Sequence, residues 1–287
     1  MKLLLLLLGI SFLAGVPLAC CMLSDEKPLL TADQFSYDQI HQLMKAHSGR
    51  YPKSDQRKGL PMPPIEKPYP ADAELIDLVP HEQIRLGDMS LLTAIDQRRS
   101  RRRFTDEYLS NEELSYLLWS TQGISKIFRR PDSSIAYHFR TVPSGGARHP
   151  FETYLAINRV EGLQPGIYRY LPIEHKLLFL KSVDNLPEKI TDACQGQKFV
   201  GQAAAVFFWA AIPYRMEWRY NVTGYKDILI ECGHVCQNLY LTAESIGAGA
   251  CAIAAYHQER ADQLIGVDGK DEFTVYASPV GKVDLSE

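Results

Sequence analysis

Residues 98–104 read RRSRRRF and set five arginines around one serine. Like charges at this density repel one another unless an anion neutralises them. Arginine guanidinium groups match the geometry of phosphate oxygens. We therefore predict that Arg98, Arg102 and the hydroxyl of Ser100 converge on a phosphate or a similar small anion, the alternative being a solvated charged face.

The composition of the whole chain makes this basic cluster a local feature. The chain has 287 residues, of which 46% are hydrophobic and 23% charged, and its formal net charge is −3. This length suffices for one large domain, or two small ones, with a substantial core. A general nucleic-acid binder usually carries a basic face and a high isoelectric point. We therefore expect no nucleic-acid partner and a small anion at the arginines.

The first 21 residues, MKLLLLLLGISFLAGVPLACC, are typical of a secretory signal peptide. Lys2 precedes an apolar run, and the closing pair Cys20 and Cys21 offers two acceptor positions for a lipoprotein signal. The alternatives are an uncleaved anchor and simple export. We expect an exported protein, periplasmic or membrane-anchored, that touches a membrane only through this segment.

Residues 22–79 are interpreted as an N-terminal extension, with a short helix over 31–47 and a proline-rich connector, LPMPPIEKPYP, over 60–70. The main domain is placed over residues 80–287. Its cysteines, Cys194, Cys232, Cys236 and Cys251, are expected to be small buried hydrophobic residues. The spacing of CGHVC, residues 232–236, puts its histidine on another helix face than its cysteines, which disfavours a metal site.

Helices and strands are predicted to mix without regular alternation, which indicates an α+β fold. Helical spacing predicts helices over 89–99, 110–124 and 227–247, with Ser90 as a cap of the first and Ser110 with Glu113 as a capping box of the second. Strands are predicted over 153–160, 203–212 and 273–282, and a hairpin over 166–172 and 175–182.

Three further segments are candidates for ligand contacts. RTVPSGGARHP, residues 140–150, can offer backbone N–H groups to a ring or a phosphate, or be an ordinary turn. PYRMEWRYNVTGY, residues 213–225, combines aromatic and cationic side chains that suit a planar or anionic substrate, or is a packed surface segment. Gly247 and Gly249 follow a helix and precede a strand, the reverse of the dinucleotide-binding order, and predict a tight turn.

In this order, these motifs resemble the nitroreductase superfamily of flavin enzymes, and within it the SagB- or ThcOx-type dehydrogenases, over residues 80–283. The resemblance implies that flavin mononucleotide (FMN) is the cofactor. It places the phosphate and ribityl contacts on the arginine motif and the closing lysine, and the ring contacts on the PSGGA loop and the strand after the long helix. The implied set is Arg98, Arg99, Ser100, Arg102, Lys282, Pro143, Ser144, Gly145, Gly146, Ala147, Ile253, Ala254 and Ala255.

The resemblance also implies a fold, an assembly and a reaction. The fold is a central antiparallel sheet flanked by helices, in an intertwined homodimer with flavin at the interface. The reaction is two-electron transfer through FMN to or from a small molecule or peptide, with NAD(P)H as a candidate electron donor. The alternative is a non-catalytic protein, tethered at the membrane, that binds flavin or another phosphate ligand.

One departure from the family concerns the catalytic pair. Azoline-oxidising relatives are thought to use a Lys-Tyr pair near the substrate, and the corresponding residues here look like Arg219 and Tyr220. An arginine keeps its charge and accepts protons poorly. The substitution therefore argues against azoline oxidation and makes Tyr220 the better acid–base candidate.

Overall fold

The computed structural model describes residues 39, 41, 44, 45 and 51–284. The chain forms two compact units, residues 1–45 and 46–287. In the first unit Gln39, His41 and Met44 are helical, within the helix expected over 31–47. The expected signal peptide, residues 1–21, lies outside the described residues. Within the part that is described, no helix combines the length and the apolar character needed to cross a membrane.

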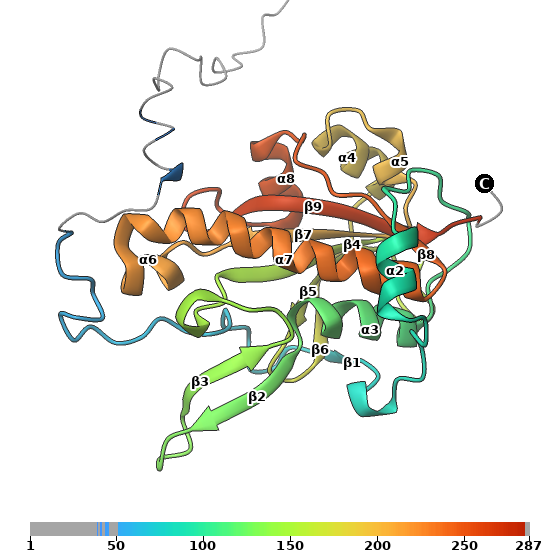
Figure 1. The fold of residues 1–287 in the computed structure, drawn as a ribbon. Helices are drawn as coiled ribbons and strands as arrows, with labels where there is room; N and C mark the ends of the chain where they lie inside the picture. Colours follow the sequence, from blue (N-terminus) through green and yellow to red (C-terminus); the bar gives the residue numbers. More distant parts are fainter. Residues whose placement is uncertain (1–38, 40, 42–43, 46–50, 285–287) are drawn as a thin grey trace, which may run out of the picture. The chain divides into compact units, whose positions relative to one another are not determined.

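A seven-stranded antiparallel sheet organises the second unit (Figure 1). Its strand order is β1-β6-β5-β4-β7-β9-β8, and every pair of neighbours is antiparallel. The strands are β1 (Leu75–Asp77), β4 (Phe151–Ile157), β5 (Gly166–Leu171), β6 (Lys176–Lys181), β7 (Ala205–Ala211), β8 (Ala248–Ala250) and β9 (Phe273–Lys282). This confirms the predicted α+β fold with a central antiparallel sheet.

Strand β7 shows why the sheet has a core on each face. All seven of its residues are buried, and side chains alternate between the two faces of a strand. Phe207 and Trp209 pack in one hydrophobic cluster, whereas Val206 and Phe208 pack in the other. The apolar run predicted as a buried central strand is therefore confirmed.

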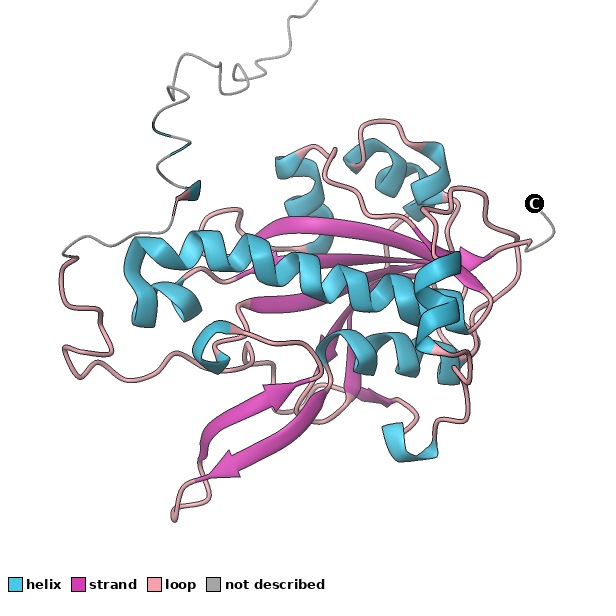
Figure 2. Ribbon diagram, in the orientation of Figure 1, coloured by secondary structure: helices cyan, strands magenta, loops and turns pink. Residues whose placement is uncertain are grey.

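Helices cover both faces (Figure 2). Helix α7 (Gly224–Ser245) contributes to the first cluster, together with α3 (Asn111–Gln122), and α2 (Leu91–Gln97) and α6 (Tyr214–Tyr220) pack against α7. Helices α4 (Leu186–Ala193), α5 (Lys198–Gly201) and α8 (Gln258–Ile265) contribute to the second. The short α6 lies in the segment predicted as a ligand-contact or surface segment.

The predicted helix caps are confirmed. The Ser90 hydroxyl accepts the Thr93 N–H of α2 at 3.1 Å. In α3, Ser110 and Glu113 form the complete capping box, and the helix ends at Gly123. These contacts fix the N-terminal ends of α2 and α3. The arginine motif lies between these two helices in the sequence.

A separate hairpin, which was not predicted, leads into the PSGGA loop; its strands are β2 (Ile124–Arg129) and β3 (Ile135–Arg140). It projects from the main sheet (Figure 1). Its turn residues, PDSS over 131–134, are a turn signal between two alternating segments that could have revealed it.

Residues 51–70, here called the strap, run along the second unit. The strap contains the expected proline-rich connector, and buried arginines donate to its backbone carbonyls. Arg215 Nε donates to Pro64 O at 3.0 Å, and Arg140 Nη2 to Ile65 O at 3.2 Å. Prolines have no N–H group to donate to a neighbouring strand, which disfavours β-sheet pairing of this segment. Side-chain donors therefore satisfy these backbone carbonyls. The compact unit thus begins before the boundary expected at residue 80.

Candidate functional site

The arginine motif forms a loop, residues 98–103, that starts where α2 ends. Ser100 bridges to Ala250 of β8, and Arg101 N–H donates to Ala250 O at 2.9 Å. A Cβ atom on Gly249 would lie 2.5 Å from the Cβ of Arg101. Glycine at this position of β8 is therefore required so that the arginine loop can lie against the edge of the sheet.

One arginine of this loop is held in an ion pair, and others remain candidates for binding a ligand. Arg101 is paired with the buried carboxylate of Glu244 on α7 at 3.2 Å. Arg98 lies over the ring of Tyr240, 5.1 Å from its centroid. The Ser100 hydroxyl is 3.0 Å from the Tyr240 hydroxyl. Glu244 therefore neutralises the positive charge of Arg101. Arg98 and Ser100 both lie at Tyr240, where they are candidates for binding an anion.

Arg102 lies close to Cys251, as Ser100 and Tyr240 do. Its guanidinium lies 6.0 Å from the Phe199 ring centroid. Burial raises the pKa of the Cys251 thiol, and the positive charge of Arg102, with smaller effects of Ser100 and Tyr240, opposes this rise. Within the described residues, neither Arg98 nor Arg102 forms an ion pair. A cavity of about 500 Å³ opens beside residues 99–105.

Two other predicted contacts of this half are already engaged. Lys282 Nζ forms an ion pair with Glu113, the capping-box residue of α3. Arg99 donates from Nη1 to the carbonyls of Asp96 and Arg98, at 2.7 and 2.8 Å. An anion at the arginine loop would therefore compete with Glu113 for Lys282.

The PSGGA loop, residues 143–147, follows β3 and is anchored on α7. Gly145 N–H donates to Glu231 Oε1 at 2.6 Å, and the Ser144 hydroxyl accepts the His149 N–H at 2.8 Å. Gly146 has a positive φ of 57°, and a Cβ there would lie 2.6 Å from Arg219 Nε and 2.7 Å from the Tyr220 hydroxyl. The structure thus brings the loop and the predicted catalytic pair together.

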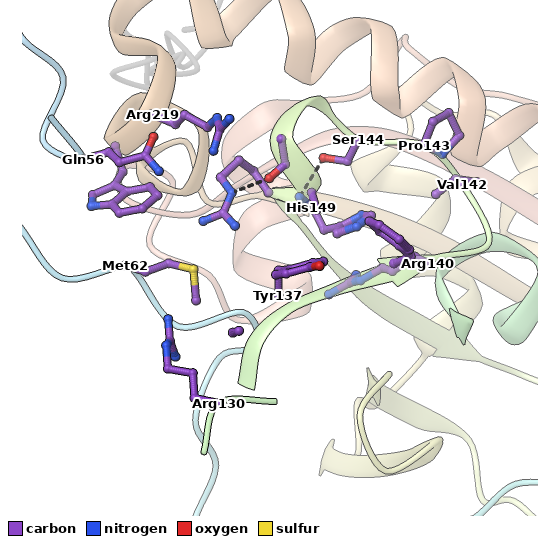
Figure 3. A pocket seen from close by; sticks show the side chains of 16 residues that line it. Gln56, Met62, Arg130, Tyr137, Arg140, Val142, Pro143, Ser144, His149 and Arg219 are labelled. Carbon is purple, nitrogen blue, oxygen red and sulfur yellow. Dashed lines mark hydrogen bonds between the residues drawn. The ribbon is translucent and has the colours of Figure 1, made fainter. Parts of the chain in front are cut away.

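A cavity of about 810 Å³, here called the PSGGA pocket, opens at this loop (Figure 3). Its walls come from four segments: the PSGGA loop with the two residues after it, the β2–β3 hairpin, α6 and the strap. The lining residues used below are Gln56, Met62, Arg130, Tyr137, Arg148, His149, Trp218 and Arg219. The strap thus contributes side chains to the wall of a candidate binding site.

Burial controls the charges beneath this pocket. Burial, with the nearby positive charge of Arg140, lowers the pKa of His138 to about 3 and depresses that of His149 further. Both imidazoles are therefore neutral. Burial also raises the pKa of Glu231 to about 7, against the opposing effect of the Gly145 N–H. Arg140, buried among these groups, donates to Gln122 Oε1 at 2.5 Å.

The two halves of the predicted cofactor site contact different stretches of α7. The arginine loop meets Tyr240, and the PSGGA loop meets Glu231. At about 1.5 Å per helical residue these contacts are about 14 Å apart along the axis. The third predicted set lies elsewhere: Ile253 is buried and bridges to Ala277, and Ala254 and Ala255 are exposed. None of these three residues lines the two cavities described above.

The four cysteines in the described part of the chain are free and buried, as predicted. Burial raises the pKa of Cys194 and of Cys236 to about 12. Such thiols stay protonated and behave as small apolar groups. Among the described residues no group of three or more histidine, cysteine or acidic side chains is placed to hold a metal ion.

Several residues that shape the site had no predicted role: Arg148, His149, Glu231, Tyr240, Tyr137, Gln56 and Met62. Arg148 and His149 lie within the quoted segment RTVPSGGARHP, so their position beside the loop was the available signal. Tyr240 and Glu231 lie on α7, and only the packed structure shows which loops they meet.

Comparison with known proteins identifies the family. Residues 95–282 match the Nitroreductase family. The Methanocaldococcus jannaschii protein MJ1384, named as a nitroreductase, is 29% identical over 211 residues, which cover 74% of this chain and 98% of that protein. The microcin B17-processing protein McbC of Escherichia coli is 26% identical over 133 residues, covering 45% of this chain and 49% of McbC.

A solved structure shows the same fold. The crystal structure of a protein from Anabaena variabilis, described as a nitroreductase, superposes with a TM-score of 0.60 at 24% identity and covers 75% of this chain. This chain spans only 42% of that longer protein. The family match covers more than half of the chain and includes the arginine loop, the PSGGA loop and α7. The chain therefore belongs to the nitroreductase family of oxidoreductases.

Proposed function

We propose that this protein is an FMN-dependent oxidoreductase of the SagB type, which passes two electrons between a donor and a small molecule or peptide. The observation that carries the proposal is that Arg98 and Ser100 lie at Tyr240 and Arg102 lies near Cys251, with both guanidinium groups outside any ion pair of the described residues. Guanidinium groups and a hydroxyl in this arrangement suit a phosphate. The likeness to McbC supports the assignment to the SagB type.

The residues present fit the cofactor. Arg98, Arg102 and Ser100 would hold its phosphate and ribityl chain, with Arg99 and Lys282 alongside. The PSGGA loop would lie against its ring, where Gly146 keeps the backbone free of a side chain. When bound, FMN would supply the two-electron chemistry, and the protein supplies anchoring and electrostatics. We propose NAD(P)H as the electron donor.

At this loop Tyr220 would supply or accept the proton, and Arg219 would supply a fixed positive charge. Tyr220 is half-buried beside Gly146, where its hydroxyl can donate or accept a proton. Arg219 lies over the Tyr220 ring, 5.6 Å from its centroid, and retains its charge. We assign Tyr220 as the acid–base residue and Arg219 as a fixed positive charge.

We further propose a homodimer in which both subunits line each flavin pocket. The two candidate halves, about 14 Å apart along α7, are compatible with a cofactor that draws its contacts from more than one segment.

We also propose that the protein is exported, and is either periplasmic or anchored to the membrane through its first 21 residues.

The test is the visible absorbance of the purified full-length protein, followed by identification of the released chromophore. Wild type should show a flavin spectrum and release FMN, and NADPH should bleach it before air restores it. The double variant Arg98→Ala, Arg102→Ala should fold but retain little flavin. An Arg85→Ala variant, at an exposed arginine outside the site, should keep full occupancy. Full flavin occupancy in the double variant would refute the phosphate assignment.

A further inference from the structure

The PSGGA pocket contains two arginines that no acid neutralises. Arg148 Nε donates to Gly146 O at 3.0 Å, and its side chain is buried. Arg219, also in the lining, lowers the pKa of Arg148 by its positive charge, after the larger effect of burial. No ion pair of the described residues includes either arginine. Two like charges at a partly desolvated wall favour a bound anion.

The rest of the lining contains no acidic side chain to repel such an anion. The sixteen lining residues include four arginines and neither aspartate nor glutamate. Two buried carboxylates are engaged elsewhere: Glu231 accepts Gly145 N–H, and Glu152 pairs with Arg215. The positive charge of the lining arginines is therefore available to a ligand that enters the pocket.

The other walls are aromatic and flat. The Arg148 guanidinium lies over the Trp218 ring, 5.1 Å from its centroid. Tyr137 of the hairpin and Met62 of the strap complete the apolar side (Figure 3). Aromatic faces and a thioether favour planar ring systems. A planar group can therefore pack in this pocket within reach of both arginines.

A buried histidine adds an unused polar atom. His149 lines the pocket, is 4% exposed, and its Nε2 has no hydrogen-bond partner in the described structure. A buried polar atom without a partner costs free energy that a ligand can recover. The neutral imidazole can therefore accept or donate a bond to a ligand without adding charge.

We propose that the PSGGA pocket selects planar carboxylates: the carboxylate lies on Arg148 and Arg219, and the ring packs against Trp218 and Tyr137. This names the substrate class of the proposed oxidoreductase and rests on that function only in calling the ligand a substrate. Binding of the anion is a property of the pocket itself. The arginine loop, which would hold the cofactor phosphate, lines a different cavity, whereas the PSGGA loop, which would contact the flavin ring, forms one wall of this pocket.

Isothermal titration calorimetry of the full-length protein with benzoate and with benzyl alcohol tests the proposal, because these probes have the same ring and differ in charge. Benzoate should bind about 10- to 100-fold more tightly, the range expected for hydrogen bonds to a charged group. Arg148→Met should remove most of this preference and leave benzyl alcohol binding unchanged. Arg129→Met, on the same hairpin as Tyr137 but outside the pocket lining, should retain the preference.

The outcomes separate this proposal from the proposed function. Equal binding of the two probes to wild type, or an undiminished preference in Arg148→Met, overturns the carboxylate assignment. Loss of flavin from a folded Arg148→Met protein also overturns it, because Arg148 would then hold the cofactor. A colourless wild type that still prefers benzoate supports the pocket while the flavin proposal fails. If Arg148→Met does not fold, Arg219→Met must show the same loss of preference.

Discussion

Replacing Glu231 by glutamine should make the stability of the protein less dependent on pH. Glu231 lies on α7 beneath the PSGGA loop, and its side chain is only 6% exposed. Its Oε1 accepts the Gly145 N–H at 2.6 Å. Glutamine retains an oxygen acceptor for the Gly145 N–H but cannot titrate.

The magnitude follows from the pKa of the carboxyl group. Burial raises the pKa of Glu231 from 4.5 to about 7, so the folded protein binds this proton more tightly than the unfolded chain does. The resulting stabilisation is fully present below pH 4.5 and is lost as the pH rises through about 7. At about 1.4 kcal/mol per pKa unit, the loss approaches about 3 kcal/mol.

Urea denaturation followed by circular dichroism at about pH 4.5, 6 and 8 measures this difference. The free energy of unfolding of Glu231→Gln relative to wild type should rise across this range by up to about 3 kcal/mol. Glu107→Gln, at an exposed position, is the control and should show a flat difference. A flat difference for Glu231→Gln as well would refute the argument that burial controls this carboxyl group.

Three further substitutions test the loops and the strap. Gly146→Ala should cost about 1–2 kcal/mol in a thermal or urea melt, because its φ is +57° and the added Cβ would crowd the neighbouring arginine. Arg101→Met should cost about 2 kcal/mol in the same assay, since it leaves the buried Glu244 carboxylate without its partner. Trp218→Phe should cost about 1 kcal/mol and speed limited proteolysis of residues 51–70, because it removes the indole N–H that donates to the strap.

The parts of the fold that the sequence predicted depend on short-range signals. Ser90 caps α2 through a residue three positions away, and the capping box of α3 has the same span. Such contacts form within one helical turn, so their residue types reveal them. The buried strand β7 was likewise predictable because an uninterrupted apolar run needs burial on both faces.

The strap could not be predicted in this way because its partners are distant in the sequence. The donors to Ile65 O and Lys67 O come from Arg140 and Arg169, 75 and 102 residues away. The proline content predicts an extended backbone, but the same composition suits a free linker and a packed strap. Only the placement of buried donors beneath it distinguishes the two.

The same limit applies within the arginine loop. The sequence predicts an anion site from five arginines, yet only the fold shows that Arg101 pairs with Glu244, 143 residues away. It also shows that Lys282 is paired with Glu113, 169 residues away. Counting charges along the sequence therefore overestimates the positive charge available to a ligand at this loop.

The position of the strap bears on how specificity is divided along the chain. The family match begins at residue 95, whereas Gln56 and Met62 lie well before it and line the PSGGA pocket. The proposed cofactor contacts all fall within the matched region, and the proposed ligand pocket draws one wall from outside it. A change in the strap can therefore alter which molecule fits the pocket without touching the arginine loop. In the proposed enzyme, the family core would supply the redox chemistry, and the N-terminal extension would help to select the substrate.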